Sequence, residues 1–204
     1  MALAGLDDEV AMPARMTRNE GRALTRERLL RTAQELFRQA GYAATSLERI
    51  AETAGYSKGA IYSNFQGKED IFLEVLDAQG QDGLIDLVEY IGRASDDASV
   101  VDCLARWADL RSRSGYWALT ILEHARLGQA NDPSVQRQAS IIRSHWRQLG
   151  SALLSRYPNL GGEAETIGAL LYEIAYAPAL TLMAKPTAGD LMRLTMTALL
   201  TRRE

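Results

Sequence analysis

Hydrophobic side chains recur at intervals of three and four residues along most of this chain, which is the spacing that places them on one face of an α-helix. The clearest stripe, within residues 24–40, consists of Leu29, Leu30, Ala33, Leu36, Phe37 and Ala40. Alternating β-branched runs, which would indicate strands, are nearly absent. The pattern therefore predicts an all-α protein.

Glycine, proline and helix-capping residues divide this pattern into about nine helices. We expect them over residues 24–40, 46–54, 58–65, 69 to about 90–93, 100–113, 116–127, 133–157, 163–184 and 190–202. Asp132 with Pro133 is expected to start one helix, and Thr187 with Asp190 has the spacing of a capping box for the last helix. Within the fourth helix, Gly80 and Gly83 each reduce helix stability by about 1 kcal/mol relative to alanine. Two readings are open there, a hinge and a less stable surface turn.

Residues 45–68, TSLERIAETAGYSKGAIYSNFQGK, organise the rest of the chain. Thr45 and Glu48 have the spacing of a capping box, in which each side chain bonds the other residue's backbone N–H. Gly55 ends the first short helix, and Ser57 caps a second. Two short helices joined by a glycine-containing turn make a helix-turn-helix, whose second helix enters the DNA major groove.

Over about residues 24–73 the sequence resembles the N-terminal domain of TetR-family transcriptional regulators. The positions that carry this resemblance are Phe37, Gly41, Thr45, Ile50-Ala51, Ala54-Gly55, Ser57, Gly59, Tyr62, Phe65 and Lys68-Glu69. At Asn64 the family often has histidine. The remainder resembles the family only in being helical, with compatible helix lengths.

The resemblance implies a helix-turn-helix DNA-binding domain over residues 21–68 and a ligand-binding and dimerisation domain over 69–204. Residues 1–20 are expected to be a flexible tail, and Arg15, Arg18 and Arg22 are candidates for an arm that reaches the minor groove. The implied function is that of a homodimeric repressor, released from a pseudo-palindromic operator by an unknown small molecule. Two alternatives remain: a similar regulator that activates or has no ligand, and a helical enzyme or adaptor that contains a three-helix unit.

Candidate DNA-binding residues cluster around the two short helices. Thr45 and Ser46 stand at a helix N-terminus, where free N–H groups suit a phosphate. Lys58 can donate to guanine O6 or N7, while Ser57, Gly59 and Ala60 let the helix approach the groove. By the resemblance, Tyr62, Asn64 and Lys68 bind phosphate.

The charge distribution favours this location for a DNA-binding surface. Residues 14–68 carry ten Lys/Arg against five Asp/Glu, whereas residues 69–204 carry 13 against 18. A basic N-terminal segment on an acidic remainder is typical of a small DNA-binding head joined to a larger body.

The composition indicates the class of protein and its cellular location. The 204 residues are 47% hydrophobic and 24% charged, which is ordinary for a globular protein. Cys103 is the single cysteine, no apolar run has membrane-spanning length, and Asp7, Asp8 and Glu9 do not fit a signal peptide. We expect a cytoplasmic protein, not an enzyme, with no catalytic residues, metal site or cofactor.

The second domain contains aromatic residues that suit a pocket between helices. The candidate pocket residues are Trp107, Asp109, Trp117, His124, His145, Trp146, Tyr172, Glu173 and Tyr176. If Asp109 or Glu173 points inward beside the aromatic rings, a cationic aromatic ligand is favoured.

The last two helices have apolar stripes that suit a dimer interface. The candidate residues are Ile167, Leu170, Leu171, Ile174, Leu191, Leu194, Ala198 and Leu199. Two such helices from each subunit would form a four-helix bundle, as the resemblance also implies. The same residues can instead close the core of the monomer.

Overall fold

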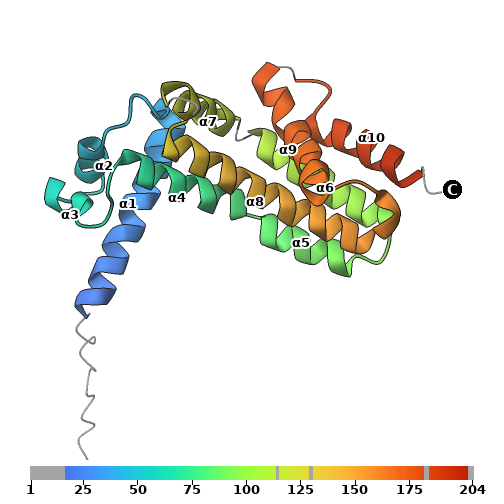
Figure 1. The fold of residues 1–204 in the computed structure, drawn as a ribbon, viewed down its shortest axis with the longest axis horizontal. Helices are drawn as coiled ribbons and strands as arrows, with labels where there is room; N and C mark the ends of the chain where they lie inside the picture. Colours follow the sequence, from blue (N-terminus) through green and yellow to red (C-terminus); the bar gives the residue numbers. More distant parts are fainter. Residues whose placement is uncertain (1–16, 114, 129–130, 182–183, 202–204) are drawn as a thin grey trace, which may run out of the picture.

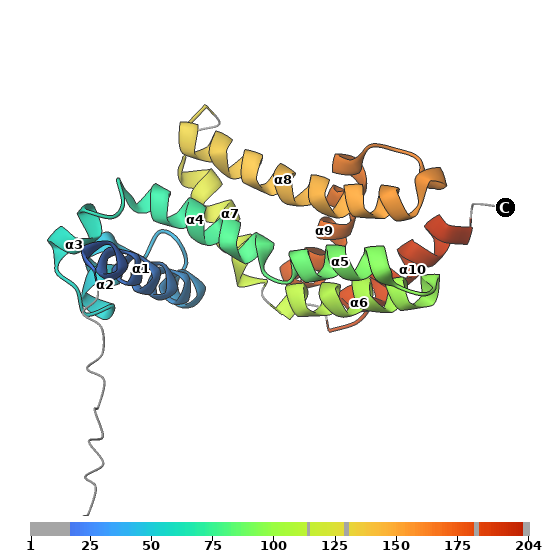
Figure 2. The ribbon, with the colours of Figure 1, turned by 90° about the horizontal axis from the view of Figure 1, so that it is seen from below.

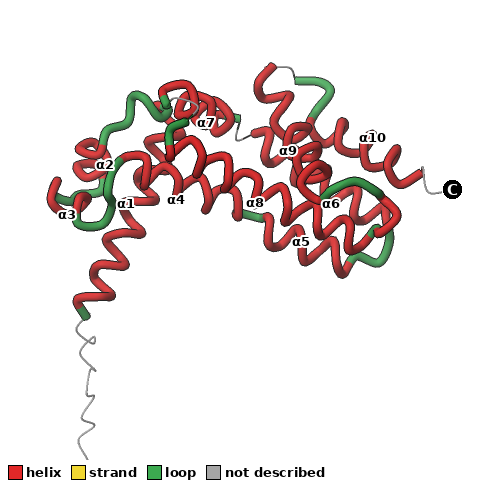
Figure 3. Tube along the Cα trace, in the orientation of Figure 1, coloured by secondary structure: helices red, strands yellow, loops and turns green. Residues whose placement is uncertain are grey.

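The computed structural model describes residues 17–113, 115–128, 131–181 and 184–201, and these residues are almost entirely helical. Figure 3 shows helices and loops but no strand in this part of the chain. The all-α prediction is confirmed. The structure contains α1 (Arg18–Ala40), α2 (Leu47–Thr53), α3 (Lys58–Tyr62), α4 (Lys68–Gln81), α5 (Leu84–Arg93), α6 (Asp97–Arg113), α7 (Tyr116–Leu127), α8 (Pro133–Arg156), the single 3-10 turn η1 (Pro158–Leu160), α9 (Ala164–Thr181) and α10 (Ala188–Thr201).

The described residues thus form ten α-helices, one more than the expected nine, because the helix expected from 69 to about 90–93 is divided. α4 ends at Gln81, and Asp82 follows with non-helical backbone angles. Gly83 then adopts a positive φ of 70°, which a residue with a side chain rarely adopts, and α5 begins at Leu84. The glycines indicated a weak point in one long helix, and in the structure the helix is completely interrupted there.

The first helix begins earlier than the hydrophobic stripe suggested. Thr17 caps α1 by accepting a hydrogen bond from the Glu20 backbone, and the Glu20 carboxylate accepts one from the Thr17 N–H at 2.7 Å. This capping box starts the helix at Arg18, so Arg18 and Arg22 lie on α1 rather than in a tail. Arg15 and the rest of residues 1–16 lie outside the described residues, as do residues 182–183 and 202 at the expected ends of the last two helices.

In place of the capping box expected at Thr45 and Glu48, α2 has a simple N-cap one residue later. Ser46, rather than Thr45, caps α2, and its hydroxyl accepts from the Arg49 N–H at 3.1 Å. The other predicted caps are confirmed: Ser57 caps α3, Asp132 precedes Pro133 of α8, and Thr187 and Asp190 bond each other reciprocally before α10.

Two hydrophobic cores hold the chain together. We call α1, α2 and α3 the head and α5–α10 the body, with α4 between them (Figure 1). The head core includes Leu29, Phe37, Ile50 and Ile61, and Phe72 of α4 is fully buried within it. The body core lies among α5, α6, α8, α9 and α10, with Leu104, Leu149 and Leu171 completely buried.

Close contact between α8 and α9 forms the centre of the body. A Cβ on Gly150 of α8 would approach the Ala164 carbonyl oxygen to 1.8 Å, and one on Gly168 of α9 would approach that of Trp146 to 1.8 Å. Both positions therefore require glycine for the two backbones to approach this closely. Figure 2 shows α8 extending along both α4 and α5, so this long helix spans the whole body.

None of the helices in the described ranges combines the length and the apolar character that crossing a membrane requires.

Candidate DNA-binding and ligand-binding sites

The outer face of α3 is exposed to solvent. Ile61 of α3 and Phe65 after it are buried in the head core, and they fix the orientation of the helix. Lys58, Gly59 and Tyr62 consequently face solvent, and Tyr62 is 50% exposed. The structure thus brings three of the predicted DNA-binding residues together on one face.

Lys58 is tied to the preceding helix. Its ammonium lies 2.7 Å from the Glu48 carboxylate of α2 and 5.8 Å from the centre of the Tyr62 ring. The hydrogen bond that Lys58 donates to Glu48 raises the pKa of Lys58 above its ordinary value. Lys58 must release this exposed ion pair, which is weak in water, before it can reach a base.

Three predicted DNA-binding residues turn inward instead. Thr45 is only 1% exposed, and its hydroxyl donates to the Gly41 carbonyl at 2.8 Å. The Asn64 side-chain amide donates to the Ala60 carbonyl at 2.8 Å, and its oxygen is buried with no hydrogen-bond partner among the described residues. The Lys68 ammonium donates to the Tyr42 carbonyl at 2.7 Å and lies 4.0 Å from that residue's ring centre.

These geometries give Thr45, Asn64 and Lys68 a structural role in the head, and their expected contacts with DNA stay predictions. All three close the C-terminal ends of helices or the turn after α1, because carbonyl groups there lack helical partners. Burial lowers the pKa of Lys68. Their contribution in this structure is to hold the head together, and the outward residues Ser46, Ser57, Lys58, Gly59 and Tyr62, with the half-buried Ala60, remain as the candidate DNA surface.

Arginines of α1 form contacts that the sequence did not indicate. Arg22 donates to the carbonyl of Ser63, the residue that caps the end of α3, at 2.9 Å. Arg26 forms an ion pair with Glu74 of α4, and its guanidinium lies 4.7 Å from the ring centre of Phe65. The arginines that recur along α1 were the sequence feature that could have indicated these contacts. Their partners, however, are more than 35 residues away in the chain.

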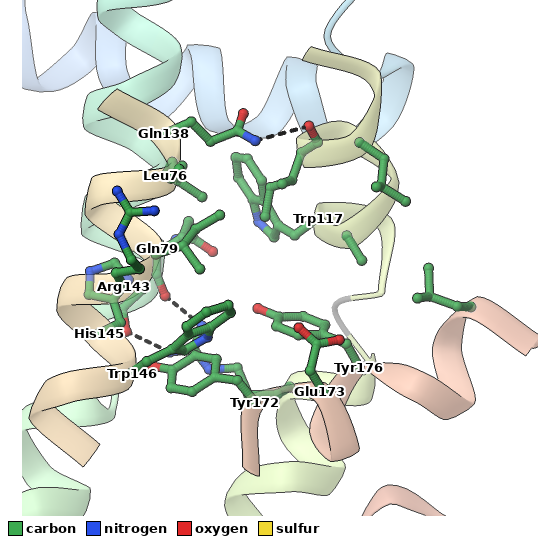
Figure 4. Close-up of a pocket in the computed structure, with 18 of the residues that line it drawn as sticks. Leu76, Gln79, Trp117, Gln138, Arg143, His145, Trp146, Tyr172, Glu173 and Tyr176 are labelled. Carbon is green, nitrogen blue, oxygen red and sulfur yellow. Dashed lines mark hydrogen bonds between the residues drawn. The ribbon is translucent and has the colours of Figure 1, made fainter. Parts of the chain in front are cut away.

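A cavity of about 510 Å³ lies where α4, α6, α7, α8 and α9 meet. Its size falls within the range of about 300–1,000 Å³ that holds small organic ligands. Figure 4 shows Trp117 on one side of this cavity and Trp146, Tyr172 and Tyr176 on the opposite side. The remaining wall combines the aliphatic residues Leu76, Ile121, Leu122, Val135, Ile142 and Leu180 with polar and charged residues.

The structure brings six of the nine predicted pocket residues into this wall, namely Trp117, His145, Trp146, Tyr172, Glu173 and Tyr176. The other three lie elsewhere. Trp107 packs edge-on against Tyr172 within the body core, and Asp109 accepts from the Gly189 N–H at 2.7 Å, at the start of α10. His124 lies among the rings of Tyr42 and Phe72 in the interior.

The sequence did not single out Arg111, which closes the C-terminal end of α4 beside the cavity. Its guanidinium donates to the carbonyls of Gln79, Gly80 and Asp82 at 2.7, 2.8 and 2.9 Å. A basic side chain is favourable there because it satisfies unpaired carbonyls and the negative end of the helix dipole. Arg111 thereby fixes the end of α4 to α6.

Two polar groups of the cavity wall have no hydrogen-bond partner among the residues that the structure describes. These are the Tyr172 hydroxyl and the Trp117 indole N–H, in side chains only 5% and 3% exposed. Burial raises the pKa of Tyr172 above its ordinary value, so the hydroxyl keeps its proton. An unpaired buried donor costs about 1–3 kcal/mol, which a bound acceptor would recover.

The predicted dimer residues divide into two groups. Ile167 and Leu171 are buried in the body core, and Ile174, Leu191 and Leu199 are half-buried. Leu170 of α9 and Leu194 of α10 are 43% and 70% exposed, and Ala198 is also exposed. These last three are the predicted residues that a second subunit can reach.

Comparison with known proteins supports the assignment that the sequence pattern indicated. Residues 29–75 match the family described as bacterial regulatory proteins, tetR family. The chain is 45% identical to the transcriptional regulator AcrR of Shigella flexneri over 62 residues. These residues make up 30% of this chain and 28% of AcrR. The chain spans less than half the length of AcrR and of other curated relatives, such as TtgR of Pseudomonas putida. These relatives are transcriptional regulators, in agreement with the prediction that the protein is not an enzyme.

Solved structures extend the likeness to the whole fold. A TetR-family regulator from Mesorhizobium loti superposes with a TM-score of 0.70 at 20% identity, over 92% of this chain and 98% of that one. FadR of Bacillus subtilis, crystallised with stearoyl-CoA, superposes with a TM-score of 0.65 at 17% identity, over 87% and 99%. Residues 29–75 therefore match the tetR family of bacterial regulatory proteins, and the all-α fold of the chain is similar to that of a TetR-family regulator.

Proposed function

We propose that this protein is a DNA-binding transcriptional regulator that represses by occupying an operator and leaves it when a small molecule fills the cavity. One observation carries the proposal: α4 contributes both to the core of the DNA-binding head and to the wall of the cavity. Its residues Ile71 and Phe72 are fully buried in the head core, whereas Leu76, Gln79 and Gly80 form part of the cavity wall.

The head supplies the contact with DNA. The outer face of α3, with Lys58 and Tyr62, enters the major groove, and Ser46 at the start of α2 faces a phosphate. Few of these side chains can read base edges, so a single head binds weakly.

A homodimer strengthens the binding by presenting two heads. Leu170, Leu194 and Ala198 form an exposed apolar face on α9 and α10 that a second copy would cover. Two-fold symmetry then predicts a pseudo-palindromic operator with half-sites about 34–36 Å apart, or a multiple of this distance. A regulator must reach the chromosome, so the proposal includes a cytoplasmic location.

A ligand in the cavity would act on the head through α4. The C-terminal carbonyls of α4 are held by Arg111, and Gly80 lies against the ring of His145. A molecule that binds better when this end of α4 is displaced shifts the heads to a spacing that does not fit the operator. The complex of FadR with stearoyl-CoA supports a ligand-binding role for this fold.

Enrichment of bound duplexes from random DNA by the purified full-length protein tests the proposal. We expect a pseudo-palindromic sequence, bound by two subunits and lost when five base pairs are inserted between the half-sites, because half a helical turn places them on opposite faces. Binding of unrelated DNA with equal affinity would contradict the proposal.

A regulator that activates or has no ligand is the second candidate. The cavity favours the ligand-dependent function, since its wall contains unpartnered buried donors. An operator complex that persists when a cavity-binding molecule is present at saturating concentration would support the second candidate.

A further inference from the structure

The chemistry of the cavity wall specifies the class of molecule that it accepts, and this inference rests on the proposed ligand response. Trp117 and Trp146 present indole rings, and Tyr172 and Tyr176 present phenol rings, so the walls suit a flat hydrophobic body. The cavity of about 510 Å³ leaves room for a ring system of two or three fused rings.

The unsatisfied polar groups of this wall are donors. The Trp117 indole N–H can only donate, and the Tyr172 hydroxyl keeps its proton. A ligand atom that accepts hydrogen bonds would satisfy them, whereas a ligand ammonium would leave the indole N–H unpaired.

The charges of the wall point the same way. Arg111 and Arg143 line the cavity, and the guanidinium of Arg111 lies 5.9 Å from the ring centre of Tyr172. Burial is the main cause that raises the pKa of the Tyr172 hydroxyl, and the positive charge of Arg111 acts against it. Arg111 thus offsets part of the cost of placing a negative group at that end of the cavity.

The acidic residues of the wall offer little to a cation. Glu165 lies 3.8 Å from Arg147, which balances its charge, and the Glu173 side chain is exposed. Asp109, the other acid considered for a cationic ligand, bonds the start of α10 instead. The electrostatics of the interior therefore disfavour the cationic aromatic ligand that the sequence left open.

We propose that the cavity binds planar hydrophobic carboxylates, with the carboxylate accepting a hydrogen bond from the Tyr172 hydroxyl on the side of Arg111. Trp117, on the opposite side of the cavity, is also buried in the head core, so the ring system of the ligand would contact a side chain shared by the cavity and the head.

Four probes with the same ring system test this chemistry by calorimetry on the full-length protein without DNA. They are naphthalene-2-carboxylate, its neutral methyl ester, 2-methylnaphthalene and 2-naphthylmethylammonium. We expect affinity to fall in that order, with the carboxylate at least tenfold tighter than the hydrocarbon. Equal or tighter binding of the ammonium or the hydrocarbon, or no binding of the carboxylate at millimolar concentration, would overturn the proposal.

The variant Tyr172→Phe removes only the hydroxyl and keeps the ring that packs on Trp107. We expect it to weaken the carboxylate about tenfold and to leave 2-methylnaphthalene unchanged. Tyr90→Phe, at an exposed tyrosine of α5, is the matched control and should bind all probes as the wild type does. An unchanged carboxylate affinity in Tyr172→Phe would refute the assigned contact.

Addition of the carboxylate to the operator complex separates this inference from the proposed function. Tyr172-dependent binding without release of DNA would sustain the ligand class and refute the proposed regulatory response. Release by a probe that does not depend on Tyr172 would sustain the response and refute the ligand class.

Discussion

Gly80 of α4 lies directly against the imidazole ring of His145 of α8. A Cβ at Gly80 would approach the ring carbon Cε1 of His145 to 2.0 Å, so the contact exists only because residue 80 is glycine. His145 Nε2 also lies 2.9 Å from the Asp77 carboxylate, one turn earlier on α4. The end of the helix shared by the head and the cavity is therefore set by one glycine, one histidine and the guanidinium of Arg111.

Replacement of Gly80 by alanine should destabilise the protein by about 1–3 kcal/mol, because the methyl group forces the His145 ring or α4 to move. Urea unfolding at fixed protein concentration measures this change. The control is Gly92→Ala, where a Cβ meets no atom within 4 Å and the helix propensity of alanine should stabilise slightly. Equal stability of the two variants would show that α4 does not pack this closely on α8.

Acidification should destabilise the protein between about pH 7 and pH 5. Burial lowers the pKa of His124 and of His145 below their ordinary value of 6.5. The hydrogen bond to Gln138 acts to raise the pKa of His124. At His145, Asp77 acts to raise the pKa, whereas the positive charge of Arg111 lowers it further. The unfolded chain then binds protons that the folded protein does not, so stability falls as pH falls through 6.5. The slope is at most about 1.4 kcal/mol per pH unit for each histidine.

Urea unfolding at pH 7.5, 6.5 and 5.5 measures this dependence. In His145→Gln the slope should fall to about half, because one of the two groups no longer titrates. Stability that is constant or increases on acidification over this window would contradict the burial of neutral histidines.

The contacts of Gly80 and Arg111 could not be predicted from the sequence, because they join residues that are far apart in the chain. Capping residues and glycines act within a few positions, so the helix-turn-helix and the caps at Ser57 and Thr187 could be predicted. Arg111 donates to the carbonyls of Gln79 and Gly80 across 32 and 31 residues of chain, and no local pattern encodes such a pairing. The aromatic residues of the cavity were predictable as a group, but the sequence did not show that Trp117 of α7 lines the cavity whereas Trp107 of α6 packs in the body core.

Substitution of Glu48 by glutamine should raise the affinity for DNA about two- to fivefold. The change frees Lys58 from its ion pair and removes a negative charge beside the proposed phosphate contacts. Fluorescence anisotropy with an enriched duplex at several salt concentrations measures it, and the salt dependence should become steeper. Lower affinity in this variant would indicate that the ion pair positions Lys58 for binding.

Introduction of a charge at Leu194 should weaken the proposed dimer at least thirtyfold. Leu194 is 70% exposed on α10, and a glutamate there would be buried without a partner between the subunits. Sedimentation velocity should show monomers for Leu194→Glu at concentrations where the wild type is dimeric. Ile85→Glu, at a 64% exposed position of α5, is the control and should remain dimeric. A dimeric Leu194→Glu protein would place the interface elsewhere.

The affinity of the protein for an enriched duplex, compared between the wild type and the double variant Lys58→Ala/Tyr62→Ala, tests the central claim most directly. Both side chains are exposed and absent from the head core, so the variant should fold with wild-type stability. The account predicts that specific binding falls at least a hundredfold, to the level of unrelated DNA. Unchanged specific affinity in the folded double variant would contradict the assignment of α3 as the DNA-recognition helix.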